Sequence, residues 1–214
     1  ALITMINKHD KIKCSSLENI KIKNKLLKKA FDDLPIDLKN AMKLAFNRIK
    51  VFHEKQKLSG FDYVDEIGVN LGLKYSPIKR VGFYTPGGKA LYPSSVLMNA
   101  IPALVAGVEE RVLVSPINIE KSSEILLAAA YLAEVTEFYR MGGAQAIAAL
   151  AFGTEKLKKV DKIVGPGNDY VAEAKRQSFG KVGIDSVAGP SEVLIVADKI
   201  NQPEWIALDL LSQA

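Results

Sequence analysis

Three small polar side chains beside glycines are the residues of this chain whose type and position suit ligand binding. Gln145 follows a glycine pair, Asn168 ends the sequence GPGN, and Ser191 lies in the sequence AGPSE. Each falls where an expected strand gives way to the next element, which is the edge of an α/β sheet where ligands bind. Core packing alone does not call for polar residues on such turns, so the pattern predicts ligand-binding turns.

The glycine pair Gly142 and Gly143 begins an expected helix. A ligand can approach such a backbone closely, and the first N–H groups of a helix lie at the positive end of its dipole. Gln145 then lies in the first turn and faces the same cleft. The alternative is a tight strand–helix turn with an exposed glutamine.

The other turns follow the same logic, and each has a plainer alternative. In GPGN, Pro166 fixes the turn, Gly167 supplies a special backbone dihedral, and Asn168 offers both a donor and an acceptor. The alternative is that Asn168 only caps a helix. The sequence TPGG follows Tyr84 at the same expected edge. Tyr84 is either a packed aromatic residue or part of a nucleotide pocket.

Several familiar site patterns are missing from the sequence. Neither the GxGxxG fingerprint nor the phosphate loop GxxxxGK[ST] occurs, so the spacing does not support a standard Rossmann pyrophosphate grip. His9 and His53 lie far in sequence from the turns, and we expect them to be packing or surface residues. The chain alone therefore cannot assemble a complete ordinary zinc site.

Composition indicates a globular cytoplasmic protein. The chain has 214 residues, 48% of them hydrophobic, and one cysteine, Cys14, which suits a reducing compartment. It has no apolar run of about 18 residues and no secretory leader, so we expect no membrane contact. The net charge of +5 comes largely from lysines at residues 8–58, which alternate with acids without interleaved aromatics. This favours solvated helices over a nucleic-acid surface.

The chain alternates expected strands and helices, which predicts a mostly parallel sheet with right-handed crossovers. Residues 16–58 should form helices, either a dimerisation arm or an ordinary packed hairpin, and residues 62–80 short strands and turns. The expected later strands are 81–84, 111–115, 137–141, 162–165 and 193–198; the expected later helices are 93–107, 120–133, 142–152, 167–179 and 203–214. The last helix has no C-cap glycine and looks cut in its middle.

Taken together, these segments resemble histidinol dehydrogenase, the last enzyme of histidine biosynthesis. The resemblance runs from about residue 67 to residue 214, in the family's order and at similar spacing. Its blocks are VGFYTPGG (81–88), MGGAQAIAALAFG (141–153), VDKIVGPGN (160–168), EAKRQ (173–177), AGPSE (188–192) and DLLSQA (209–214).

The resemblance implies a homodimer that uses Zn²⁺ and NAD to oxidise L-histidinol to L-histidine through L-histidinaldehyde. Tyr84, Gln145 and Asn168 match NAD-contacting positions of the family. Ser191 matches a substrate-contacting position, and Gln213 matches a position that binds both zinc and substrate.

The family pattern continues beyond the last residue of this chain, so the resemblance covers only an N-terminal half. The acid–base pair and the other zinc ligands are expected in the remainder, and this chain alone should be inactive. Residues 84–190 should form a Rossmann-like domain, whereas 1–83 and 191–214 belong to a second, incomplete α/β domain. An exposed apolar surface should result, which favours pairing or aggregation.

Two rival functions remain open. A cysteine-dependent aldehyde dehydrogenase needs a thiolate nucleophile, and the chain offers only Cys14, in a different part of the sequence. The other rival is a non-catalytic binding or scaffold remnant of the same fold.

Overall fold

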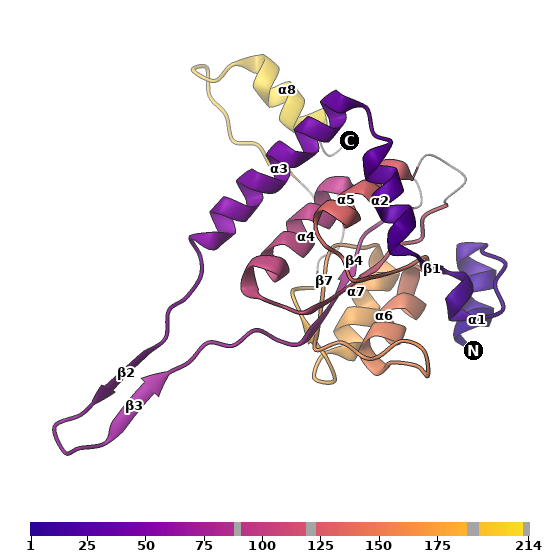
Figure 1. Cartoon of the computed structure of the whole chain (residues 1–214). Coiled ribbons are helices and arrows are strands. Elements are labelled where there is room, and N and C mark those ends of the chain that lie inside the picture. Colours follow the sequence, from indigo (N-terminus) through magenta and orange to yellow (C-terminus); the bar gives the residue numbers. More distant parts are fainter. Residues whose placement is uncertain (88–90, 119–122, 188–192, 212–214) are drawn as a thin grey trace.

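A six-stranded sheet forms the centre of the computed structural model, which describes residues 1–87, 91–118, 123–187 and 193–211 (Figure 1). The strand order is β1-β6-β5-β4-β7-β8, and every pair is parallel except β1 with β6. The strands are β1 (Lys21–Ile22), β4 (Arg80–Tyr84), β5 (Glu110–Val114), β6 (Glu137–Tyr139), β7 (Lys162–Val164) and β8 (Gly183–Ile184).

The order of the strands reverses at β4. From β4 the chain builds β5 and then β6 on one side, and it later returns to add β7 and β8 on the other side. The carboxyl ends of β4 and β7 therefore flank the point at which the winding changes direction, where ligands bind in open α/β sheets.

Helices cover both faces of the sheet, and alternate strand residues face each layer. Phe83 and Leu113 belong to one buried cluster, and their neighbours Tyr84 and Val114 belong to the other. The first layer contains α2 (Asn24–Asp32), α3 (Ile36–Glu54), α4 (Pro93–Ala106) and α5 (Glu124–Leu132), and the second contains α1 (Leu2–Met5), α6 (Gly143–Phe152) and α7 (Asp169–Ser178). Burial on two faces explains why these strands are apolar throughout.

Local sequence sets the helix ends and the close packing of α6. Pro93 opens α4, and Gly107 ends it in the left-handed region with φ 84°. Helix α6 buries mainly alanines, which let it lie close to the sheet. A Cβ atom at Gly82 of β4 would come within 2.9 Å of the Leu150 side chain, so this glycine makes room for the helix.

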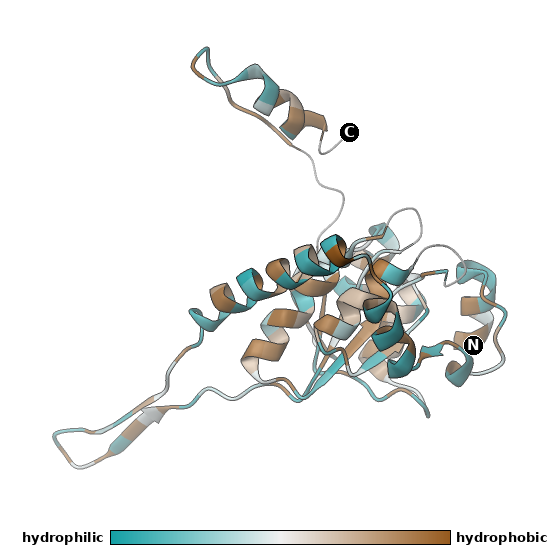
Figure 2. Ribbon diagram, turned by 45° about the horizontal axis from the view of Figure 1, so that its top comes forward, coloured by the Kyte–Doolittle hydropathy of each residue, from teal (hydrophilic) through white to brown (hydrophobic). Residues whose placement is uncertain are grey.

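Two parts of the chain project from this body. The hairpin of β2 (Phe61–Val64) and β3 (Asn70–Leu73) extends away from the sheet, and all its strand residues are exposed (Figure 1). Helix α8 (Pro203–Leu211) buries no residue and stands apart from the sheet, with hydrophobic residues along it (Figure 2). None of the helices in the described ranges is both long and apolar enough to cross a membrane.

The structure confirms the expected strands near residues 81–84, 111–115, 137–141 and 162–165 to within two residues at each end. The expected strand 193–198 is wrong, because this segment has no strand pairing and Leu194 and Val196 are 89% and 90% exposed. A strand needs a neighbour for its backbone hydrogen bonds, and no described residue supplies one. The expected helical region 16–58 is interrupted by a 3₁₀ turn, Leu17–Asn19, and by β1.

Candidate ligand-binding site

Tyr84 ends β4 with its ring buried and its hydroxyl at the start of α6. The residue is 4% exposed and packs in the cluster beneath α6 and α7. Its hydroxyl oxygen accepts a hydrogen bond from the Gly143 N–H at 3.2 Å. Tyr84 is therefore a packed aromatic residue whose polar end reaches the turn that the sequence predicted as a ligand site.

Both glycines before Gln145 are required by the geometry of the turn. Gly143 has φ 61°, in the left-handed region where glycine is favoured. A Cβ atom at Gly142 would come within 2.6 Å of the Pro116 ring. Gln145 lies half-buried in the first turn of α6, as expected from the sequence.

The carboxylate of Asp10 lies at the same helix end, although no sequence motif points to it. Its Oδ2 atom accepts hydrogen bonds from the Gly142 N–H at 3.1 Å and from the Gln145 Nε2 at 3.2 Å. Asp10 ends a short π-helix, Ile6–Asp10, more than 130 residues before its partners in sequence. No motif or periodicity marks such a contact, because it arises only when the N-terminal segment packs on α6.

A small loop holds Asp10 in place. Lys11 follows it in the left-handed region with φ 55°, which turns the chain back. The Asn7 side chain closes the loop, since its Oδ1 accepts from the Cys14 N–H and its Nδ2 donates to the Cys14 carbonyl, both at 2.9 Å. The buried side chain of Ile6 anchors the loop in the cluster beneath α6.

Burial governs the protonation of the two ionisable groups in this turn. Burial raises the pKa of Asp10, although the hydrogen bonds from Gly142 and Gln145 and the nearby His9 act to lower it. Burial also raises the pKa of Tyr84, and the charge of Asp10 raises it further against the Gly143 hydrogen bond. The Tyr84 phenol thus keeps its proton at neutral pH and can donate it in a hydrogen bond.

Asn168 caps α7, as the plainer alternative supposed. Its Oδ1 accepts from the Val171 N–H at 3.1 Å, and its backbone has extended geometry. The amide nitrogen is not needed for the cap and remains a donor. The structure therefore shows the capping role, and contact with NAD stays a prediction.

The GPGN turn lies against Tyr84 and is held by a partly buried ion pair. Gly165 has φ 109°, and a Cβ atom there would collide with the Tyr84 carbonyl oxygen. The Lys175 ammonium, 2% exposed, donates to the Gly165 carbonyl at 3.0 Å and pairs with the Asp185 carboxylate. Asp185 in turn accepts from the Gly165 N–H at 2.8 Å, so both polar groups of Gly165 are fixed.

Two buried hydroxyls at the same edge have no hydrogen-bond partner among the described residues. They are Thr85 Oγ1 just after β4 and Ser115 Oγ just after β5, and both residues are fully buried. A buried polar group without a partner is costly, and it suits a place where a ligand or water completes the bonding.

The structure thus brings together part of the predicted site. Tyr84 and Gln145 meet at the start of α6, and the turn that carries Asn168 lies against Tyr84. Ser191 and Gln213 lie outside the described residues. In the described part of the chain, no three His, Cys, Asp or Glu side chains form a group that could hold a metal ion.

Cys14 lies close to this site in space despite its distance from the turns in sequence. Burial raises the pKa of its thiol, with Arg140 acting in the opposite direction. The thiol lies 3.3 Å from the Asn7 Oδ1, to which it donates a hydrogen bond. A raised pKa disfavours the thiolate that a nucleophile needs.

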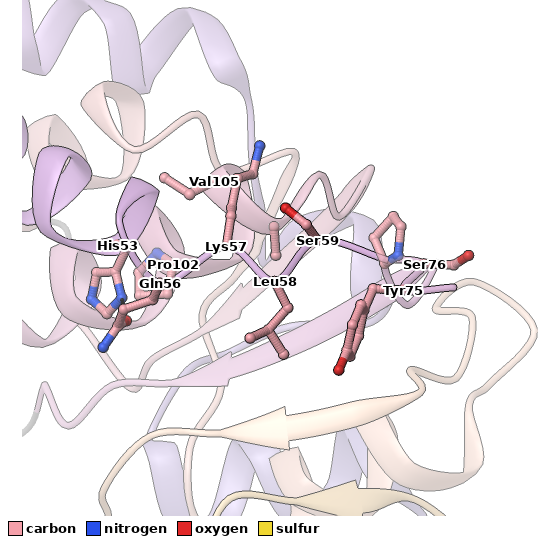
Figure 3. Close-up of a pocket in the computed structure, with 11 residues that line it drawn as sticks. His53, Gln56, Lys57, Leu58, Ser59, Tyr75, Ser76, Pro102 and Val105 are labelled. Carbon is pink, nitrogen blue, oxygen red and sulfur yellow. Dashed lines mark hydrogen bonds between the residues drawn. The ribbon is translucent and has the colours of Figure 1, made fainter. Parts of the chain in front are cut away.

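A large cavity lies elsewhere, at the amino end of the sheet (Figure 3). It has a volume of about 630 Å³, and its walls come from the end of α3, the root of the hairpin and the last turn of α4. Residues 75–77 lead into β4, and Val105 precedes β5, so this cavity faces away from Tyr84. Figure 3 shows His53 beside Gln56 at one end, and their side chains lie 2.6 Å apart.

The sheet and its winding place this chain among α/β proteins with a mostly parallel central sheet. Within that class, the chain belongs to the histidinol dehydrogenase family, whose family model, described as "Histidinol dehydrogenase", matches residues 1–214.

Individual relatives agree with this assignment. Histidinol dehydrogenase of Dechloromonas aromatica (strain RCB) is 51% identical over 214 residues, which are 100% of this chain and 49% of that protein. Histidinol dehydrogenase 1 of Trichormus variabilis is 60% identical over 178 residues, 83% of this chain and 41% of that protein. The crystal structure of histidinol dehydrogenase from Elizabethkingia anophelis matches with TM-score 0.89 and 39% identity, covering 100% of this chain and 49% of the other. The chain spans about half the length of the curated relatives it matches.

Proposed function

We propose that the protein containing this chain oxidises L-histidinol to L-histidine through L-histidinaldehyde with NAD, and that this chain supplies the NAD-contacting edge. The observation that carries the proposal is the meeting of Tyr84, the glycine pair and Gln145 at the carboxyl edge of a parallel sheet. Bound NAD would supply the hydride acceptor for both oxidation steps.

The residues of this chain bind and orient the dinucleotide in this proposal. Tyr84 offers a protonated hydroxyl, Gln145 an amide, and Asn168 an amide nitrogen left over from its cap. The glycines let the turn pack tightly, so that the Tyr84 hydroxyl and the Gln145 amide lie together at Gly143. Because Asp10 already uses the Gly142 N–H, α6 does not serve as a pyrophosphate grip, which agrees with the missing GxGxxG pattern.

The remaining groups of the reaction come from outside the described residues. Ser191 and Gln213 are proposed to contact L-histidinol, and Gln213 to bind Zn²⁺ as well. The other metal ligands and the acid–base pair are proposed to lie in a further segment of the protein. One amide oxygen is a weak ligand for zinc, so this chain alone would not retain the metal.

The same proposal assigns the architecture of the whole protein. Residues 84–190 supply most of the Rossmann-like part, and β1, the start of β4 and helices α1 to α3 join the same sheet and its layers, so the expected boundary at residue 83 does not separate them. In this proposal, residues 191–214 belong to a second α/β domain that a longer chain completes. The protein works as a homodimer, and the exposed apolar residues of the hairpin and of α8 are available for these contacts.

Turnover by the full-length protein tests this function. With zinc, NAD and L-histidinol, we expect two NADH for each L-histidine formed, and no turnover from the purified 214-residue chain. A matched reaction without histidinol controls for background reduction. Failure of the full-length protein to reduce NAD would overturn the proposed function. Turnover by the 214-residue chain would show that the catalytic groups lie within it.

A further inference from the structure

One oxygen atom of Asp10 holds both the backbone and the side chain of the predicted cofactor turn. Its Oδ2 accepts from the Gly142 N–H and from the Gln145 Nε2. The two donors lie at the cap and in the first turn of α6, the helix that also presents its Gly143 N–H to Tyr84. A single carboxylate therefore links the N-terminal segment to the groups proposed to contact NAD.

The carboxylate also decides which way the Gln145 amide points. An ionised carboxylate only accepts hydrogen bonds, so the Nε2 end of the amide must face Asp10. The Oε1 end then lies over Gly143, where an added Cβ atom would be 2.9 Å from it. The result is a carbonyl acceptor and the Tyr84 hydroxyl donor side by side at one glycine.

We propose that Asp10 is a positioning residue of the NAD site, which fixes the Gln145 amide so that its carbonyl oxygen faces the ligand beside the Tyr84 hydroxyl. This inference rests on the proposed function. Asp10 itself need not touch the cofactor, because its effect passes through Gln145 and the glycine turn. Without it, the glutamine side chain can rotate, and ordering it costs conformational entropy at each binding event.

A double-mutant cycle in the full-length protein tests the link between the two residues. The four proteins are the unaltered form, Asp10→Ala, Gln145→Ala and the double variant. We expect Asp10→Ala to raise the KM for NAD by about tenfold, with kcat and the KM for histidinol unchanged. In the Gln145→Ala background, Asp10→Ala should add less than about twofold.

Conservative and matched variants separate positioning from a general loss of structure. Asp10→Asn keeps an acceptor oxygen of the same shape and should restore most of the affinity for NAD. Lys8→Ala changes an exposed neighbour in the same segment and should leave all constants unchanged. If Asp10→Ala does not fold, Asp10→Ser takes its place in the cycle, since its shorter side chain cannot reach Gln145.

The results that would reject the Asp10 inference differ from those that would reject the proposed function. Turnover by the unaltered protein tests that function, whereas only the ratios among the variants test Asp10. An unchanged KM for NAD in Asp10→Ala would overturn the inference. The inference would also be overturned if the fold-increases in the KM for NAD of Asp10→Ala and Gln145→Ala multiply in the double variant. Asp10 would then act independently of Gln145.

Discussion

At the scale of single residues, the candidate site consists of ordinary groups in fixed positions. Tyr84 is a core residue whose hydroxyl emerges at a glycine turn, and Gln145 is tied by a carboxylate from the other end of the chain. The Asn168 side-chain oxygen caps α7. The proposed ligand-binding roles therefore fall on side chains that already have structural roles, and a useful variant must change one role at a time.

Asn168 allows this separation. Asn168→Ser keeps a capping oxygen and removes the amide nitrogen, whereas Asn168→Ala removes both. In the full-length protein we expect both variants to raise the KM for NAD by about fivefold, and only Asn168→Ala to lose about 1 kcal/mol of stability. Steady-state kinetics and thermal unfolding measure the two effects. An unchanged KM for NAD in both variants would reject the cofactor role.

Cys14 tests the rival nucleophilic chemistry. Its raised pKa and its hydrogen bond to Asn7 favour the protonated thiol. Cys14→Ser in the full-length protein should therefore leave both oxidation steps intact, as measured with L-histidinol and with L-histidinaldehyde as separate substrates. Loss of the aldehyde step alone would revive a cysteine-dependent mechanism.

Among the elements, the two edges of the sheet carry different kinds of residues. The carboxyl edge carries the glycine turns, whereas the amino edge carries an ion cluster that joins neighbouring strands. The Arg80 guanidinium at the start of β4 pairs with Glu110 of β5, and with Glu137 of β6 at 2.7 Å. Lys21 of β1 adds a further contact to Glu137 at 3.2 Å. This cluster ties four strands together.

Acid should weaken that cluster in a defined range of pH. Burial acts to raise the pKa of Glu137, but hydrogen bonds from Tyr139, Arg80 and Lys21 lower it to about 2. A lowered folded-state pKa means that the contribution is complete above the ordinary pKa of 4.5 and is lost as the pH falls towards 2. The contribution should be about 2 kcal/mol after allowance for solvent screening.

Glu137→Gln is the variant that checks this range, measured by thermal unfolding of the full-length protein across pH. Its deficit relative to the unaltered protein should be present at neutral pH and shrink between pH 4.5 and 2. Glu173 is a matched control, because exposed Arg176 lowers its pKa to about 2 at a fully solvated site. Glu173→Gln should change stability little, and an equal effect of both variants would show that the Glu137 ion cluster does not stabilise the sheet.

The elements also show what the sequence could predict. Apolar runs separated by glycine turns indicate β4 to β7 and their helices, because each such strand is buried on both faces within a short stretch of chain. The two-residue strand β1 and the Asp10 contact depend on packing between distant segments, which leaves no local pattern. The segment 193–198 has the apolar composition of a strand, but composition alone cannot supply a hydrogen-bonding neighbour.

Across the whole molecule, the segments that project from the sheet expose apolar side chains to solvent. Leu194, Val196 and Ile200 are at least 87% exposed, and Trp205 is 66% exposed. The hairpin adds Phe61 and Val64, at 58% and 65%. Exposed apolar surface of this kind marks a place for protein contacts.

Self-association should follow when the 214-residue chain is studied by itself. Sedimentation velocity should show oligomers whose size grows with protein concentration, and a hydrophobic dye should fluoresce on binding the chain. The full-length protein is the control, and it should form only a defined dimer and bind little dye. A monomeric chain that does not increase the dye's fluorescence would show that these apolar surfaces do not require contact with another part of the protein.

Hydrogen–deuterium exchange of the full-length protein, with and without NAD, tests directly where the cofactor binds. We expect added protection at residues 84–87, 141–147 and 165–171, along the carboxyl edge of the sheet. We expect no change at residues 53–59 and 75–77, of which several line the cavity at the opposite edge. Protection of that cavity, with the carboxyl edge unaffected, would contradict the placement of the cofactor at Tyr84, Gln145 and Asn168.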